Sequence, residues 1–400
     1  MLACLTTRER LLLGIVALVV AVTAALEYGG NSDVAVFVVA ALALAGVAWV
    51  VSFSTEAVGE RFGPALTGVL QSTLGNLPEL FVVLFALSAG HLVVAQYSIL
   101  GSLFANALLV LGLVILAGSR AAGGTMKFGR RLPNDTATLL LLAVFIISIL
   151  GSLFANALLV LGLVILAGSR AAGGTMKFGR RLPNDTATLL LLAVFIISLL
   201  GVSDRAGDNA SKHQVAISAI GAVVLLGVYS VWVFFYLRDR EETHVTQARV
   251  PLPIAVGLLA GAGVAAAFVS DWFVGALEPA IESLGISEEF TGLVIVGIAG
   301  NAVENVVGIS LAAKGENELA ISVVKNSVAQ IAAFLFPALV LLSLFLDTHL
   351  TFVIPTVYVG ALFLMAIAVW QVTQDGEAVA FEGLALVGFY VILAVLTFYE

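Results

Sequence analysis

Long apolar segments follow one another along this chain, with only short polar stretches between them. Hydrophobic residues make up 61% of the sequence and charged residues only 11%, and the mean hydropathy is +1.11. A soluble domain instead has roughly 45–50% apolar and about 25% charged residues. Because a helix that spans a lipid bilayer needs about 20 apolar residues, the pattern predicts an all-α, polytopic membrane protein without a sizeable soluble domain.

The apolar segments define the candidate membrane spans. The first could also be read as a signal peptide, since Arg8 and Arg10 precede its apolar run. We interpret it as a transmembrane helix, because the rest of the chain is itself embedded in the membrane. The candidate spans are residues 11–27, 34–52, 66–89, 92–117, 137–168, 187–203, 214–237, 252–273, 290–313, 319–346, 352–371 and 381–399.

A tandem duplication complicates the topology. Residues 99–148 recur without a single change at residues 149–198. Divergent repeats do not keep such identity, so the duplication is very recent or an artefact of assembly, and the functional argument counts one copy. It also creates the span 137–168, which as one helix would measure about 48 Å at 1.5 Å per residue, against a membrane core of about 30 Å.

Positive charge assigns sides to the loops. The basic loop 118–136 and its copy 168–186 are both expected in the cytoplasm. The run 137–168 between them must therefore cross the membrane twice or not at all. A tight hairpin near Gly151 satisfies this condition and gives about thirteen spans, or about eleven without the duplication.

The same rule orients the remaining chain, with its N-terminus in the cytoplasm. Residues 238–250, which carry Arg249, form a cytoplasmic connector, and the acidic loop from Glu278 to Glu289 lies outside. The expected organisation is a leading transmembrane helix at 1–30, a first repeat at 31–237 that contains the duplication, the connector, and a second repeat at 251–400.

Two matching motifs mark the repeats. Gly75, Asn76 and Glu79 in GNLPEL match GNAVEN at an offset of 225, and the same offset relates Ser102 to Ser327. The loop assignments make the two motif helices run in opposite directions. Inverted repeats that meet at the middle of the bilayer are a recurring architecture of secondary transporters. The second motif consists of Gly300, Asn301 and Glu304.

The paired glutamates, Glu79 and Glu304, predict cation chemistry. An ionised carboxylate at the centre of a membrane costs at least about 2.5 kcal/mol, so each should be protonated or hold a cation. Two carboxylates neutralise one divalent ion or bind two protons. Calcium needs about 6–8 oxygen ligands. Further oxygens can come from backbone carbonyls freed where Gly75 and Gly300 interrupt their helices, and from the amides of Asn76 and Asn301, which share a helix face with the glutamates.

Other sequence features narrow the classes of function. Polar residues on the helices after each motif either line an adjacent path or only bond helices together; they are Ser102, Asn106, Ser327 and Gln330. The histidines, His91, His213, His244 and His349, lack metal-ligand spacing and are expected at the surface. No P-loop, zinc-protease or dinucleotide-binding motif is present, so no enzyme activity and no cofactor is expected.

The net charge and the cysteine content limit the possible partners and cross-links. The net charge is -8 and no basic stripe suits nucleic acid. A single cysteine, Cys4, cannot form an internal disulfide. The expected partners are the lipid bilayer and the transported ions, and the sequence carries no signal for an oligomeric state.

The quoted residues resemble a known family, the cation/proton exchangers of the calcium/cation antiporter superfamily, which share the sodium/calcium exchanger membrane fold. The resemblance runs through STEAVGERFGPALTGVLQSTLGNLPEL, GSLFANALLVLG, SEEFTGLVIVGIAGNAVEN and NSVAQIAAFLFPALVLL. It implies a leading helix followed by two inverted five-helix repeats, and exchange of cytosolic calcium for protons.

The resemblance also implies residue roles. Glu79 and Glu304 would bind calcium and protons, with Asn76 and Asn301 beside them. Ser102, Asn106, Ser327 and Gln330 would line the adjacent path. Glu56, in the dipeptide TE of the first matching block, would lie at the cytosolic entrance.

This sequence departs from the family pattern in three places. Asn305 stands where the family commonly has histidine, and Lys325 where an apolar residue is usual. The duplication leaves open whether Asn106 or Asn156, and Ser102 or Ser152, belongs to the functional bundle.

Two alternatives to calcium/proton exchange follow from these residues. The nearer is a sodium/proton or sodium/calcium exchanger on the same fold. The other is a receptor or scaffold without transport activity, which would not need paired carboxylates inside the membrane. The plain N-terminus favours a prokaryotic inner membrane as the location.

Overall fold

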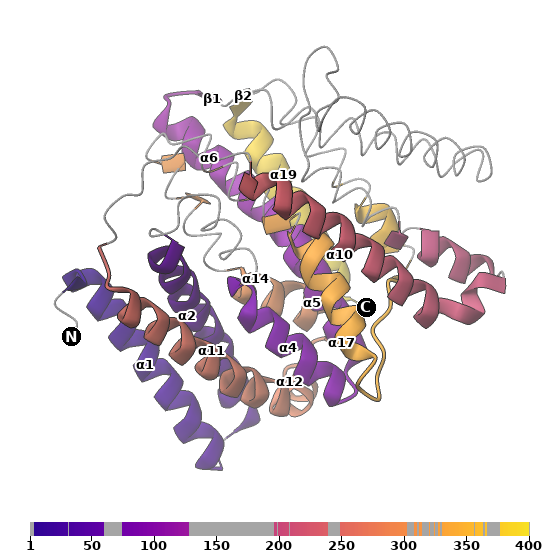
Figure 1. The fold of residues 1–400 in the computed structure, drawn as a ribbon, viewed down its shortest axis with the longest axis horizontal. Coiled ribbons are helices and arrows are strands. Elements are labelled where there is room, and N and C mark those ends of the chain that lie inside the picture. Colours follow the sequence, from indigo (N-terminus) through magenta and orange to yellow (C-terminus); the bar gives the residue numbers. More distant parts are fainter. Residues whose placement is uncertain are drawn as a thin grey trace.

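The computed structural model describes residues 4–30, 32–59, 74–127, 196–238 without 198 and 208, 249–301, 330–362 without 356, 365 and 377–399, together with separate positions between 308 and 328. Helices make up almost all of this part of the chain (Figure 1), as the sequence predicts. The proposed hairpin near Gly151 and nearly all of the second copy of the duplication lie outside the described residues.

The N-terminal half supplies the following elements: α1 (Thr7–Tyr28), α2 (Asp33–Gly59), α4 (Leu77–Ser88), α5 (Leu92–Phe104), the π-helix η2 (Ala105–Val110), α6 (Leu111–Ala121) and the strand β1 (Thr125–Lys127). After the duplication come the 3-10 helix η3 (Asn209–His213), α10 (Gln214–Arg238), α11 (Leu252–Gly275), α12 (Leu277–Leu284), α13 (Glu288–Phe290), the π-helix η4 (Thr291–Val296) and α14 (Gly297–Gly300). The chain ends with the π-helix η5 (Ile331–Leu335), α17 (Phe336–Ser343), β2 (Glu377–Val379) and α19 (Ala380–Phe398).

Five of these helical stretches are long and apolar enough to cross a membrane, within the part of the chain that the structure describes. They are Thr7–Tyr28, Asp33–Val58, Leu92–Ala121, Asn209–Phe234 and Leu252–Gly275. A sixth candidate is the pair Leu277–Leu284 and Glu288–Gly300, which is bent by 116°. The architecture is therefore polytopic, and the remaining predicted spans fall on shorter helices or outside the described residues.

Helix α1 packs as the first span of the bundle. Its start is fixed by a capping box, in which the Thr6 hydroxyl accepts from the Glu9 N–H and the Glu9 carboxylate accepts from the Thr6 N–H. Val16 then contacts α2 at Gly46, where an added Cβ atom would lie 3.0 Å from a Val16 methyl carbon. Helix α1 thus joins the bundle in this structure.

Contacts between loops define two ends of the bundle. At the first, called the Glu9 end, Arg249 pairs with Glu9. At the second, called the His91 end, His91 Nδ1 lies 3.4 Å from Glu288 Oε1, and the Ser287 hydroxyl donates to the Thr397 carbonyl. Each set joins loops that the charge analysis places on one side of the membrane.

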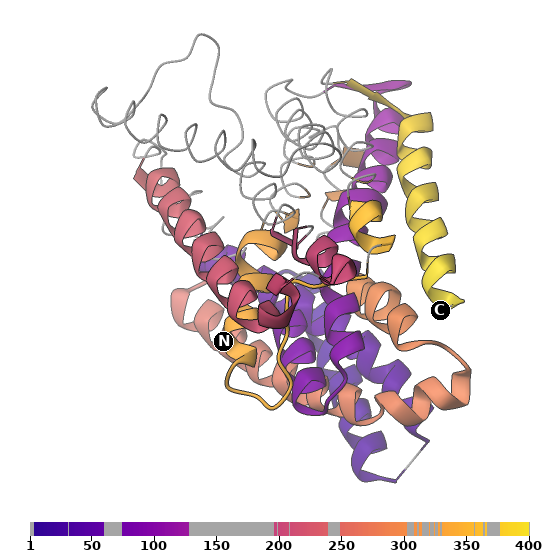
Figure 2. The same ribbon diagram turned by 90° about the vertical axis from the view of Figure 1, so that its right-hand side faces the viewer.

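Within the described residues, a small two-stranded β-ribbon departs from the predicted all-α class. β1 pairs antiparallel with β2, aligning Thr125 with Val379 and Lys127 with Glu377. Figure 2 shows the ribbon beside the adjoining ends of α6 and α19, which pack along each other. Strands of three residues carry too little alternation for a sequence pattern to reveal them.

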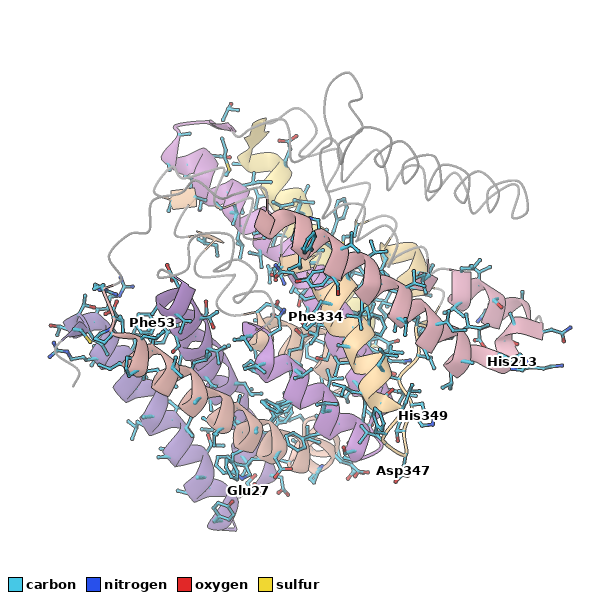
Figure 3. The ribbon with its side chains drawn as sticks, viewed as in Figure 1. Glu27, Phe53, His213, Phe334, Asp347 and His349 are labelled. Atoms are coloured by element: carbon cyan, nitrogen blue, oxygen red, sulfur yellow. The ribbon has the colours of Figure 1, made fainter. Side chains whose placement is uncertain are left out.

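Labelled side chains in Figure 3 agree with the expected surface positions. His213 and His349 lie at the periphery, the latter on the loop beyond α17 with Asp347. His91 differs from the expectation, because its side chain is only 16% exposed and contacts Glu288.

The internal repeat is visible in the helix geometry. Adding the offset of 225 to η2 gives residues 330–335, and η5 occupies Ile331–Leu335. π-Helical turns are rare and cluster at functional sites. Two at equivalent positions support the repeat that the motifs indicate.

Candidate ion site

Each Gly–Asn pair lies at a helix end within the described residues. Asn76 precedes α4 with φ −91° and ψ 15°, and Asn301 follows α14 with φ −103° and ψ 19°. These similar dihedral angles lie in the bridge region between the helical and extended conformations. Asn76 lies at the N-terminus of α4, and Asn301 lies at the C-terminus of α14.

Glu79 lies completely buried in the first turn of α4. A Cβ atom added to Gly300 would lie 3.5 Å from Glu79 Cβ and 4.0 Å from Glu79 Oε2. The glutamate of the first motif therefore lies directly against the glycine of the second. The N-terminus of α4 also favours a negative charge at this position.

A hydrogen-bonded network joins the two halves beside this contact. The Asn106 amide nitrogen donates to Asn301 Oδ1 and, at 3.1 Å, to the Ser327 hydroxyl. The Asn301 amide nitrogen donates to the Gly297 carbonyl at 2.8 Å. Asn106 and Asn301 are fully buried and Ser327 is 4% exposed. The first copy of the duplication thus supplies the asparagine of this network.

Several buried oxygen atoms near the network have no hydrogen-bond partner among the residues that the structure describes: Asn76 Oδ1, Asn106 Oδ1 and Ser102 Oγ. A buried polar atom without a partner costs about 1–3 kcal/mol. Neutral amide and hydroxyl oxygens of this kind are ligands that calcium accepts. Within the described ranges, no three histidine, cysteine, aspartate or glutamate residues are grouped so that they could hold a metal ion. The oxygen donors identified in this region are Glu79 and the neutral oxygens.

The remaining predicted site residues differ in burial, and some lie outside the described residues. Gly75 and Gly300 are both buried. Gln330 is half-buried at the start of η5. Glu56 is exposed on α2, and its neighbour Ala57 packs with Leu5 and Val250 at the Glu9 end. Glu304, Asn305 and Lys325 lie outside the described residues.

Sequence reasoning missed one residue, Ser98. It is fully buried on α5, and its hydroxyl has no hydrogen-bond partner in the described part of the structure. The available signal was its spacing, since Ser98, Ser102 and Asn106 recur every four residues and so follow one face of the helix.

Substituting Asn106 tests which copy of the duplication serves the site. Asn106→Leu removes both donated hydrogen bonds and leaves Asn301 Oδ1 and Ser327 without this partner, which should cost about 1–3 kcal/mol. We expect a large fall in calcium-dependent stabilisation, measured by thermal unfolding in detergent. Asn156→Leu, at the identical position of the second copy, is the matched control and should behave as wild type. Equal effects of both substitutions would contradict the assignment.

Two helix ends at matching motifs meet at a buried carboxylate and a polar network that joins both halves of the chain, an arrangement typical of secondary transporters built from repeats. The comparison with known sequences makes this specific. The chain belongs to the sodium/calcium exchanger protein family, whose model matches residues 32–150 and 254–399, more than half of the sequence. The first match ends at residue 150 and so takes in the first copy of the duplication.

Curated relatives cover nearly the whole chain. The vacuolar calcium ion transporter of Schizosaccharomyces pombe is 29% identical over an alignment of 381 residues, and the match covers 91% of this chain and 79% of the relative. The Ca²⁺/H⁺ antiporter of Synechocystis is 26% identical over 390 residues, covering 93% of this chain and 92% of the relative.

Solved structures share the fold. The structure of native YfkE matches with a TM-score of 0.71 at 23% identity, covering 97% of this chain and 100% of the other. The H⁺/Ca²⁺ exchanger CAX matches with a TM-score of 0.67 at 14% identity, covering 98% and 93%.

Proposed function

We propose that this protein is a secondary active transporter that exchanges calcium for protons across a membrane by alternating access. The observation that carries the proposal is the burial of Glu79 against Gly300, beside amide and hydroxyl oxygens contributed by both repeats. The curated relatives support the choice of ions, since they carry the names calcium ion transporter and Ca²⁺/H⁺ antiporter.

The site residues have distinct roles in this proposal. Glu79 and Glu304 bind calcium when ionised and protons when neutral, so one calcium ion and two protons compete for the same charge. The oxygens of Asn76 and Asn301, with backbone carbonyls near Gly75 and Gly300, complete the coordination that calcium needs. Ser102, Asn106, Ser327 and Gln330 line the adjacent path, and Glu56 lies at the cytosolic entrance.

Alternating access follows from the inverted repeat. The two motif helices and their neighbours rearrange around the site, so that it faces one side and then the other. We place the Glu9 end in the cytoplasm, because the basic loops adjoin it, and we place the protein in a prokaryotic inner membrane.

Everted membrane vesicles test the proposed exchange. A proton gradient with the acidic side inside the vesicle should drive uptake of radioactive calcium as protons leave, and a protonophore should abolish this uptake. Collapse of the proton gradient by sodium without any calcium flux would instead identify a sodium/proton exchanger. Calcium flux driven only by sodium would identify a sodium/calcium exchanger. Absence of every flux in correctly folded protein would favour a receptor or scaffold.

Deleting one copy of the duplication should preserve transport. Removal of residues 149–198 retains the copy whose Asn106 bonds to Asn301, and the flanking basic loops keep their sides if the intervening run crosses twice. We expect calcium uptake rates within about twofold of the full chain, a difference of roughly 0.4 kcal/mol in activation free energy. Loss of uptake in a stably inserted deletion variant would show that the second copy takes part in transport.

A further inference from the structure

Ser98 and Ser102 on α5 do not bond as hydroxyls in this protein's helices usually do. A helical serine or threonine commonly donates to the carbonyl four residues back. Among the described residues, the side chains that do so have donor–acceptor distances from 2.6 to 3.3 Å; they are Thr23, Ser54, Thr55, Ser88, Ser119, Ser230, Thr291 and Thr397. Ser98 and Ser102 are fully buried, and neither hydroxyl has a hydrogen-bond partner among the described residues.

These hydroxyls follow one face of α5 between the site and the His91 end. His91, Ser98 and Ser102 fall within about 40° of one another around a helix with 3.6 residues per turn. At 1.5 Å per residue, Ser98 lies about 6 Å from Ser102 along the axis, and His91 about 10 Å beyond Ser98. One turn past Ser102, the buried Oδ1 atom of Asn106 also has no hydrogen-bond partner among the described residues.

The face adjoins a seam between the two repeats, formed by α5 and the segment α13–η4–α14. A Cβ atom added at Gly292 would lie 2.9 Å from the Ser98 backbone nitrogen, and one at Gly101 would lie 2.2 Å from the Leu293 carbonyl oxygen. At Gly297 an added Cβ would lie 2.9 Å from Gly101 Cα. Glycines at these positions let the two backbones approach closely, so the seam is a direct contact between the two repeats.

The outer end of the seam is polar and half-buried. The side chains of His91 and Glu288 are 16% and 36% exposed, and Glu288 begins the segment that continues into η4. A line of polar groups therefore runs from this pair, past Ser98 and Ser102, to the Asn106 and Asn301 network.

We propose that the Ser98–Ser102–Asn106 stripe is a water-lined route for protons between the ion site and the His91 end of the protein, formed when the α5 seam opens. This inference rests on the proposed calcium/proton exchange and assigns a path to one of its two ions. A serine hydroxyl both donates and accepts, so each can hold a bridging water, which typically makes about three hydrogen bonds.

The chemistry of the stripe suits protons better than calcium. Calcium needs about 6–8 oxygen ligands and charge compensation. Ser98 and Ser102 supply one neutral oxygen each and no carboxylate, whereas a file of waters passes a proton without needing either. Calcium therefore takes another route to Glu79.

Cysteine accessibility tests whether water reaches the stripe. The only native cysteine is Cys4, so Ser98→Cys is made in a Cys4→Ser background. Silver ion is the probe, and it is applied to everted and to right-side-out vesicles under proton gradients of either direction. The thiols that silver has not modified are then labelled with a maleimide. Ser119→Cys is the matched control, because Ser119 is 2% exposed on the same continuous helix and donates to Ile115.

We expect silver to modify the Ser98→Cys thiol at least about tenfold faster than the Ser119→Cys thiol, from the side that bears His91 and under one gradient direction. Equal rates from both sides under both gradients would overturn the water route. Labelling needs no transport activity, so this outcome is distinct from failure of calcium uptake in the wild-type protein.

Transport kinetics of Ser98→Ala then identify the ion. The maximal rate of proton-driven calcium uptake should fall by roughly tenfold, equivalent to about 1.4 kcal/mol, while the KM for calcium stays unchanged. A raised KM with an unchanged maximal rate would mean that calcium follows the stripe and would overturn the assignment to protons. Wild-type values for both constants would overturn it as well.

Discussion

Replacing Glu79 by glutamine should abolish proton-driven calcium uptake. The substitution keeps the shape of a completely buried side chain but removes the charge that binds calcium and the group that takes up a proton. We expect the uptake rate in everted vesicles to fall at least about a hundredfold, which corresponds to roughly 2.7 kcal/mol. Glu304→Gln should have the same effect if the second glutamate completes the site.

The control for Glu79→Gln is an exposed acidic residue. Glu282 lies on α12 and is exposed, so Glu282→Gln makes the same chemical change away from the site and should leave the rate near wild type. Both variants must reach the membrane in equal amounts, which immunoblotting of the vesicles measures. Substantial uptake by Glu79→Gln would refute the role of this carboxylate.

Enlarging Gly101 should give the strongest loss of stability. An added Cβ atom would lie 2.2 Å from the Leu293 carbonyl oxygen and 2.6 Å from Leu293 Cα. Both atoms belong to the backbone, so α5 and η4 would have to separate. Overpacking of this kind typically costs about 1–3 kcal/mol and sometimes more. We expect Gly101→Val to lower the thermal unfolding midpoint in detergent by several degrees.

Gly257 on α11 provides the comparison, because an added Cβ atom would meet nothing within 4 Å. Gly257→Val introduces the same side chain into a helix of the same membrane protein and should leave the midpoint nearly unchanged. Equal destabilisation by the two substitutions would show that the close contact at Gly101 does not limit stability.

Whether each of these two glycines lies at a helix crossing could not be predicted from the sequence. Gly101 and Gly257 both lie in apolar helical segments, and nothing in the local sequence separates a glycine at a helix crossing from one that faces open space. The distinction depends on Leu293, which is remote in the chain. The missed hydroxyl of Ser98 has the same cause, since its bonding state depends on how η4 packs against α5.

The helix interruptions, in contrast, could be predicted. Gly75 with Asn76, followed by Pro78, and Gly300 with Asn301 disfavour continuous helical hydrogen bonding on local grounds. The rule of positive charge also assigns sides to the loops from the order of charged residues alone, and this assignment stays a prediction. The shared offset predicts that the two motifs meet at one site, but the particular contact of Gly300 with Glu79 comes from the structure.

The β1–β2 ribbon has a consequence for biogenesis. β1 and β2 are separated by more than half of the sequence, and next to them Gly112 and Gly383 make backbone contact, an added Cβ atom at Gly112 lying 2.6 Å from the Gly383 carbonyl oxygen. During translation α6 enters the membrane long before α19 is synthesised. The face of α6 that packs against α19 therefore stays uncovered until the last helix has been made. The contact between these two helices, which are far apart in the sequence, should accordingly form late in assembly.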